Sequence, residues 1–113
     1  MALKRLPARF YQSVGGREPV RDWLRNLDPP ARRAVGLDIM RVEYGWPIGM
    51  PVCRSLGRGL WEVRSDLPNG RIARVIFGER EGAMVLLHAF NKKTQQTPPG
   101  EIEIAMKRWR GLP

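Results

Sequence analysis

The chain has 113 residues, the length of one folded domain, and we expect residues 1–113 to form it. Lysine and arginine number 20 against 11 aspartate and glutamate residues, which gives a net charge of +9, and most of these cations are arginine. Cys53 is the one cysteine and His88 the one histidine. The composition therefore excludes an internal disulfide, a cysteine-based zinc cluster and a two-histidine metal site.

The first half of the chain predicts a strand followed by two helices. Residues 7–13 predict a short strand, which the glycines at 15 and 16 end. Pro19 opens a helix because the apolar residues at 20, 23, 24 and 27 have helical spacing. Asp28 is a predicted N-cap, with proline in the first turn, for a second helix over residues 30–44. The two helices predict a helical hairpin.

The second half predicts three strands and a helix. Residues 45–59 are rich in glycine and proline and predict a loop. Alternation over 60–65 and apolar runs over 72–77 and 83–90 predict strands, joined by a turn at 68–70 and a polar turn at 79–82. Residues 101–109 predict a C-terminal helix. The expected fold class is α+β: a strand, a two-helix hairpin, a three-stranded antiparallel sheet and a C-terminal helix.

The charge balance and the absence of long apolar runs bear on location and partners. The first residues lack the apolar segment of a signal peptide, and no run approaches the roughly 18 residues of a membrane helix, so we expect a soluble, cytoplasmic protein without a membrane partner. The arginine excess favours a polyanionic partner, because the guanidinium fork suits phosphate. Such a partner is a nucleic acid, a ribosome or an acidic protein. The alternative is that the arginines reflect a GC-rich genome and only keep the protein soluble.

Charged residues inside apolar strands are the first candidates for chemistry. Arg74 and His88 each interrupt an apolar run, so each must be solvated, paired or functional. Arg64 shares a strand face with Glu62. The structural alternatives remain open: Arg64 pairs with Glu62 or Asp66, Arg74 is an interior arginine with a carboxylate partner, and His88 is a satisfied core histidine. Lysines 92 and 93 are candidates too, and their alternative is a solvated exit from the strand.

Other catalytic arrangements have little support in the sequence. The acidic residues do not cluster as a two-metal nuclease requires, the serines have no nucleophile motif, and the glycines form no phosphate loop. What remains is metal-free and cofactor-free phosphate chemistry carried by cations. In RNA, the 2′-OH attacks the neighbouring phosphate, which requires a base, an acid and cations that stabilise the phosphorane. We expect Arg64 and Arg74 to hold the phosphate, and His88 or a lysine to transfer protons; DNA lacks the 2′-OH and is immune.

Several segments resemble one known family. They are VRDWL (20–24), LWEVR (60–64), RVIF (74–77), LLHAFNKKTQQTP (86–98) and EIEIA (101–105). Together they are similar to the phage-derived HigB-like branch of the RelE/ParE toxin superfamily, and the similarity covers nearly the whole chain. The segment from His88 to Pro98 is the most specific part of the resemblance.

The resemblance implies a compact RelE-like domain that acts as the toxin of a type II toxin–antitoxin system. It implies a ribosome-dependent endoribonuclease that cleaves translated mRNA, and a cognate helix-turn-helix antitoxin with which the toxin forms a hetero-oligomer. Carried over by position, Arg64 and Arg74 contact the phosphate or the transition state. Lys92 and Lys93 contact RNA or transfer protons, and His88 matches the family's strand. We add three candidate RNA contacts: Arg58, Arg71 and Gln95.

Two rival functions on the same scaffold stay open. One is a non-enzymatic toxin like the gyrase-directed ParE relatives, in which the arginines are only a docking surface. The other is a degenerate phage-derived relative that retains nucleic-acid binding without toxicity. Gyrase inhibition with intact mRNA distinguishes the first, and inert expression with salt-sensitive RNA binding distinguishes the second.

Overall fold

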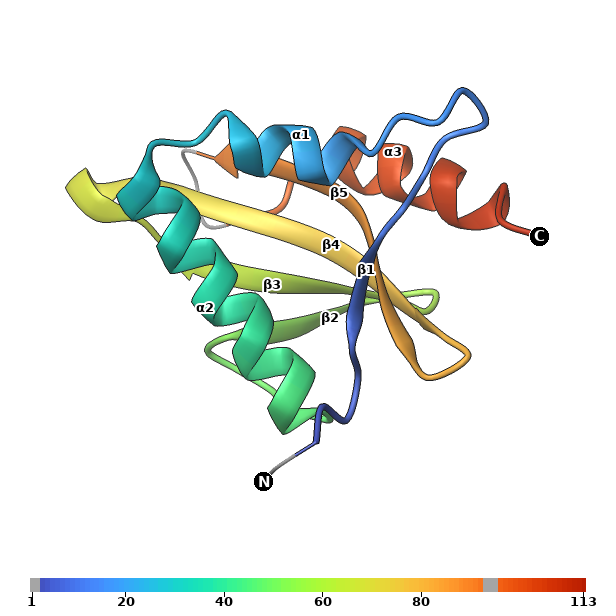
Figure 1. Cartoon of the computed structure of the whole chain (residues 1–113), viewed down its shortest axis with the longest axis horizontal. Helices are drawn as coiled ribbons and strands as arrows, with labels where there is room; N and C mark the ends of the chain where they lie inside the picture. The colour runs from blue at the N-terminus through green and yellow to red at the C-terminus, as the bar shows by residue number, and fades with distance from the viewer. Residues whose placement is uncertain (1–2, 93–95) are drawn as a thin grey trace.

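A computed structural model describes residues 3–92 and 96–113 of the chain. The candidates Lys93 and Gln95 therefore lie outside the described residues. The elements, in chain order, are β1 (Ala8–Phe10), α1 (Pro19–Arg25), α2 (Pro29–Gly45), β2 (Cys53–Gly57), β3 (Leu60–Asp66), a 3-10 turn (Pro68–Gly70), β4 (Ile72–Arg80), β5 (Ala83–Lys92) and α3 (Pro99–Arg110) (Figure 1). No helix of the described part is long and apolar enough to cross a membrane.

The strands form one mixed sheet of five strands in the order β1-β5-β4-β3-β2. β2 to β5 pair antiparallel with their neighbours, whereas β1 pairs parallel with β5. The prediction of a three-stranded antiparallel sheet is therefore wrong, although the α+β class and the three antiparallel strands β3 to β5 are confirmed. The predicted first strand over 7–13 is shorter in the structure and joins this sheet as its edge.

β2 is the strand that the sequence prediction missed, because it lies in the segment expected to be a loop. Of its five residues only Cys53 is buried, since β2 is the outer strand of the sheet. A strand so exposed carries no apolar alternation, and the prolines and glycines around it resemble those of a loop. The pairing of β1 with β5 joins segments about 75 residues apart, such as Arg9 with Val85, and no local pattern encodes it.

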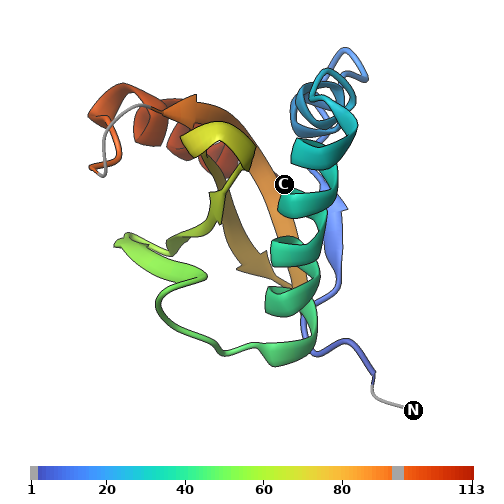
Figure 2. The ribbon, with the colours of Figure 1, turned by 90° about the vertical axis from the view of Figure 1, so that its left-hand side faces the viewer.

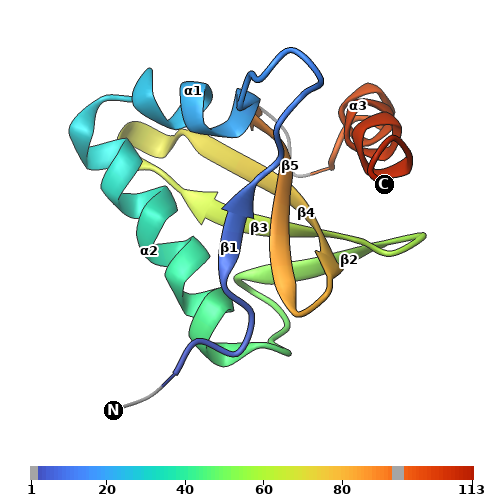
Figure 3. The ribbon, with the colours of Figure 1, turned by 45° about the vertical axis from the view of Figure 1, so that its right-hand side comes forward.

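Helices cover both faces of the sheet. Val20 of α1 and Val35, Ile39 and Val42 of α2 pack with Phe77 of β4 in the larger core. A second core lies on the opposite face, where α3 packs on the sheet; it contains Leu60, Ile76, Val85, Leu87, Phe90, Ala105 and Met106. Figures 2 and 3 show α2 and α3 on opposite sides of the twisted sheet. The predicted N-cap is confirmed, since the Asp28 side chain accepts a hydrogen bond from the Ala31 amide at the start of α2.

A bulge in β5 decides which way His88 points. Ile76 pairs with His88 and Phe77 pairs with Leu86, so Leu87 is an extra residue in β5. An extra residue reverses the alternation of side chains beyond it. Met84 and Leu86 accordingly lie in the core under α1 and α2, whereas His88 contacts α3 on the other face. Regular alternation along the strand predicts that His88 shares a face with Met84 and Leu86, and the bulge makes that prediction wrong.

Candidate functional site

The strand register gathers three of the candidate cations on one face of the sheet. Arg64 of β3 lies directly opposite Arg74 of β4, and Lys92 of β5 lies opposite Ile72, two residues from Arg74. Residues directly opposite one another in antiparallel strands project from the same face, as do residues two apart along a strand. Arg64, Arg74 and Lys92 therefore share the face on which α3 packs further along the strands.

Glu62 is the buried centre of this group. Its side chain is 0% exposed, and its Oε2 accepts a hydrogen bond from Nη1 of Arg64 at 3.0 Å. The same oxygen lies 3.6 Å from Nε of Arg74, and Oε1 accepts a hydrogen bond from the hydroxyl of Thr97. One carboxylate thus orients two guanidinium groups and ties the segment before α3 to β3. The alternative that each arginine has a carboxylate partner is therefore confirmed, because Arg64 and Arg74 both lie beside Glu62.

Arg74 is held in an environment that leaves it only partly satisfied. Its side chain is 2% exposed, its Nη1 donates to the carbonyl of Ala73 at 2.9 Å, and its buried Nε has no hydrogen-bond partner within the described residues. Burial, together with the neighbouring charge of Arg64, lowers the pKa of Arg74 from its ordinary value. Arg74 also lines a cavity, and a guanidinium at a cavity wall is suited to bind an anion there.

Lys92 shares the electrostatic environment of these arginines. It is buried, and its pKa is lowered chiefly by burial and then by the charge of Arg74, against the opposing effect of Glu62. Arg54, which lies opposite Glu62 on β2, adds to the same repulsion. Four cations thus surround one fully buried carboxylate, so the site keeps excess positive charge. An ammonium whose pKa is lowered is a stronger acid and gives up its proton more readily.

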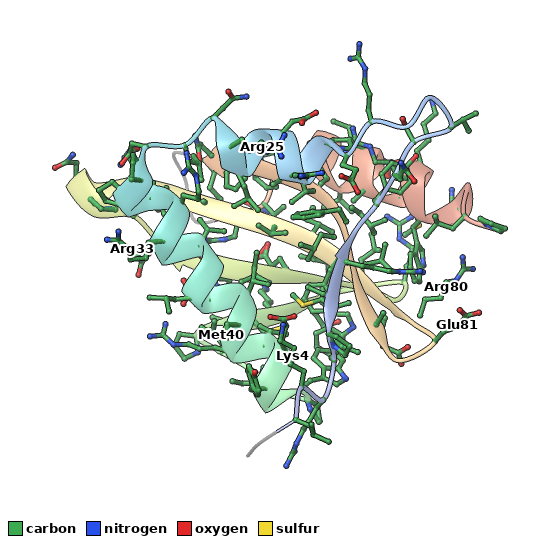
Figure 4. All side chains as sticks on the ribbon, viewed as in Figure 1. Lys4, Arg25, Arg33, Met40, Arg80 and Glu81 are labelled. Atoms are coloured by element: carbon green, nitrogen blue, oxygen red, sulfur yellow. The ribbon has the colours of Figure 1, made fainter. Side chains whose placement is uncertain are left out.

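Two cavities adjoin this group of cations, which we call the Glu62 cluster (Arg54, Glu62, Arg64, Arg74 and Lys92). The first has a volume of about 410 Å³ and is lined by Asp38, Arg41, Met50, Pro51, Val52, Arg64, Asp66 and Arg74. The second has a volume of about 380 Å³ and is lined by Gly70, Arg71, Ile72, Asn91 and Lys92. Both are large enough for a small ligand, and each exposes part of the cluster. Other cations lie at the surface: Figure 4 labels Lys4, Arg25 and Arg33, which are exposed, and Lys4 forms an ion pair with Glu43.

His88 does not join the Glu62 cluster. Its Nε2 lies 2.9 Å from Oε2 of Glu101, and Nη1 of Arg108 lies 3.4 Å from its Nδ1, so α3 holds both ring nitrogens. The ring also stacks on Phe90, which stands between His88 and Lys92 on the same face. Four residues of strand separate His88 from Lys92, roughly 13 Å. These contacts match a satisfied histidine, and a catalytic role for His88 stays a prediction.

The remaining predicted contacts lie further out. Arg71 forms two hydrogen bonds with the carboxylate of Asp28, at 2.8 and 3.3 Å, and lines the second cavity beside Lys92. Arg58 occupies the β2–β3 turn, where its Nη2 lies 3.7 Å from Oε1 of Glu103. The structure therefore brings Arg71 near the cluster and leaves Arg58 on another part of the surface.

Sequence reasoning treated Glu62 only as a partner for Arg64 and missed Thr97 and Arg54. The signal for Glu62 was present, because it stands between Trp61 and Val63 in an apolar strand, as Arg74 stands within its own. The hydrogen bond from Thr97 to Glu62 joins residues 35 apart in the chain, and no local sequence pattern predicts it. Among residues 3–92 and 96–113, no group of three His, Cys, Asp or Glu side chains could hold a metal ion.

Comparison with known proteins gives one match. No curated protein matches the chain. The family model described as "Phage derived protein Gp49-like (DUF891)" matches residues 22–110, which run from within α1 to the last residue of α3 and include the whole Glu62 cluster. The chain therefore belongs to the Gp49-like family of phage-derived proteins.

Proposed function

We propose that this protein is the toxin of a type II toxin–antitoxin system and that it cleaves translated mRNA on the ribosome as a metal-independent endoribonuclease. The observation that carries the proposal is the Glu62 cluster, in which two buried cations, one half-buried and one exposed lie around one carboxylate beside two cavities. Binding energy directed at an extra negative charge on phosphorus is the main requirement for cleavage without a metal.

The chemistry needs only groups that the cluster and the RNA supply. The 2′-oxygen attacks the adjacent phosphorus, its proton passes to a base, and the bond to the 5′-oxygen breaks as that oxygen gains a proton. The products are a 2′,3′-cyclic phosphate and a 5′-hydroxyl. Arg64 and Arg74 donate hydrogen bonds to the phosphate oxygens, and Glu62 holds both guanidinium groups in place. Lys92, with its lowered pKa, serves the proton transfer.

Family and charge support the biological setting of the proposal. The Gp49-like family is phage-derived, and the sequence resembles HigB-like toxins over nearly the whole chain. The net charge of +9 favours approach to the ribosome and its RNA. A cognate antitoxin would neutralise such a surface with an acidic segment, and the helix-turn-helix protein implied by the resemblance is the proposed partner.

The test compares wild-type protein with Arg64→Gln and with Arg25→Gln, in which an exposed arginine of α1 serves as the matched control. Each is induced in a bacterial host, and the 5′ ends of cellular mRNA are mapped. We expect wild type and Arg25→Gln to arrest growth and to create new 5′ ends within reading frames, and Arg64→Gln to do neither. Purified mRNA should be cut only when ribosomes translate it.

Two outcomes would contradict the proposal. The absence of growth arrest and of new 5′ ends with wild type would leave the degenerate, RNA-binding alternative. Growth arrest with intact mRNA and inhibited gyrase supercoiling would favour the ParE-like alternative.

A further inference from the structure

We propose that the cavity between α2 and the end of β3 binds a guanine base of the RNA, and that Asp66 recognises it. The proposal rests on the proposed function in one respect: it makes this guanine the nucleotide next to the phosphate held by Arg64 and Arg74. The guanine preference itself can be measured without any cleavage.

The two carboxylates of the cavity differ in what they already bind. Asp38 is buried and accepts a hydrogen bond from Arg41, its neighbour one turn along α2. The side chain of Asp66 is exposed at the end of β3 and forms no hydrogen bond or ion pair with any described residue, and its charge acts on Arg74 from a distance. A carboxylate accepts hydrogen bonds through both oxygens. Asp66 is therefore the acidic group of the cavity that is ready to accept hydrogen bonds from a ligand.

The arginines that line the same cavity place the phosphate of that ligand. Arg64 of β3 and Arg74 of β4 both line the cavity, and Arg74 is more than nine-tenths buried, with an Nε that lies 3.6 Å from Glu62 and has no hydrogen-bond partner among the described residues. Their charge also offsets the repulsion that Asp66 would exert on a polyanion. A phosphate held by these two side chains leaves its own nucleotide within reach of Asp66, since Arg64 and Asp66 are two residues apart on the same face of β3.

Guanine is the base whose edge matches one carboxylate. Its Watson–Crick edge presents two adjacent donors, the N1–H and the N2 amino group, and each oxygen of a carboxylate can accept one of them. Adenine and cytosine present a single amino donor beside a ring acceptor, which a carboxylate repels, and uracil presents one donor between two carbonyl oxygens. The O6 and N7 acceptors of guanine are also the groups that an arginine fork recognises. Arg41, whose Nη1 donates to Asp38, lines the same cavity.

The cavity also offers apolar surface for the face of the base. Met50, Pro51 and Val52 line it, and Met50 is 62% exposed although it is a large apolar side chain. Thioether and aliphatic groups pack well on aromatic rings. The volume of about 410 Å³ falls within the range of roughly 300–1,000 Å³ that is usual for small-ligand sites.

The first test measures binding of free nucleotides to the intact protein by NMR titration. The probes are 3′-GMP, 3′-AMP, 3′-CMP and 3′-UMP, and the proteins are wild type, Asp66→Asn and the matched control Asp22→Asn, which removes an exposed carboxylate from α1. We expect wild type and Asp22→Asn to bind 3′-GMP about tenfold more tightly than the other three nucleotides, and Asp66→Asn to lose that preference. Equal affinities in wild type, or a preference that survives in Asp66→Asn, would overturn the proposal.

The second test uses ribosome-bound mRNA in which inosine replaces the guanosine at the preferred position. Inosine lacks the 2-amino group, so wild type should cleave it several-fold more slowly than the guanosine substrate, whereas Asp66→Asn should treat the two alike. Cleavage without any guanosine preference would refute the base site and leave the proposed function intact. Guanine binding without cleavage would refute the proposed function and leave the base site.

Discussion

Replacing Glu62 with glutamine tests whether the buried carboxylate stabilises the two arginines beside it, because the change removes one negative charge and keeps the shape of the side chain. The new side chain would retain an oxygen for the Thr97 hydroxyl. With that oxygen turned to Thr97, the amide NH2 group would face Arg64 and Arg74, whose nitrogens lie 3.0 and 3.6 Å from the carboxylate oxygen. Arg64 is 14% exposed and can turn toward water, whereas Arg74 is 2% exposed and cannot.

The magnitude follows from the burial of this contact. Removing one partner of a buried ion pair costs about 3–5 kcal/mol, because the remaining charge is left uncompensated. Since Arg64 can recover solvation, we expect a loss near the lower end, about 3 kcal/mol of unfolding free energy. For a chain of this size that loss lowers the melting temperature by roughly 10–15 °C.

Urea denaturation followed by circular dichroism measures the effect. The matched control is Glu103→Gln, because Glu103 is 68% exposed and lies 3.7 Å from Arg58; it should change the unfolding free energy by less than about 0.5 kcal/mol. A second variant that also carries Arg74→Met should recover part of the loss, since no unpaired charge stays buried. An unfolding free energy of Glu62→Gln within about 1 kcal/mol of wild type would refute the reasoning.

Three further predictions concern packing, pH and the outer surface. An added Cβ at Gly78 would lie 2.7 Å from two ring carbons of Trp109, so Gly78→Ala should cost about 1–3 kcal/mol in urea unfolding, whereas Gly100→Ala, with open space around it, should be neutral or stabilising. Burial raises the pKa of Cys53 from 9.0 to about 11, so the stability that its neutral thiol supports is present below pH 9 and is lost as the pH rises toward 11. Between pH 8 and 11 the unfolding free energy of Cys53→Ala should therefore fall less than that of wild type. Arg71→Ala, which removes an exposed ion pair, should leave the urea midpoint unchanged while it weakens RNA binding measured by filter retention.

The sequence anticipated those elements whose patterns are local. The helices α1 and α2 follow from apolar spacing and from the proline and aspartate at their starts, and β3 to β5 follow from apolar runs between turn residues. The sequence did not predict β2, because this exposed edge strand has no apolar alternation. It did not predict the place of β1 in the sheet either, because the partner of β1 in β5 is distant in the chain. In both cases the missing information is tertiary.

The site, like the fold, was predictable only as far as local sequence patterns reach. Alternation along β3 put Glu62 and Arg64 on one face, and the isolated charge of Arg74 marked it as buried or functional. The meeting of Arg64 with Arg74 needed the register of β3 and β4, which the turn at residues 68–70 sets. The position of His88 depended on the bulge at Leu87, which has no signature in the sequence. The bulge puts His88 on the face that carries both α3 and the cluster, where its contacts with Glu101 and Arg108 and the length of strand before Lys92 keep it apart from the cluster.

The central claim is that the Glu62 cluster promotes attack of a 2′-hydroxyl on the phosphate of ribosome-bound mRNA. The most direct measurement compares two such complexes that differ in one sugar, a ribose or a 2′-deoxyribose at the cleaved position. The account predicts that the ribose substrate is cut to a 2′,3′-cyclic phosphate and a 5′-hydroxyl, and that the deoxyribose substrate stays intact. Equal cleavage of the two substrates, or no cleavage of either, would contradict it.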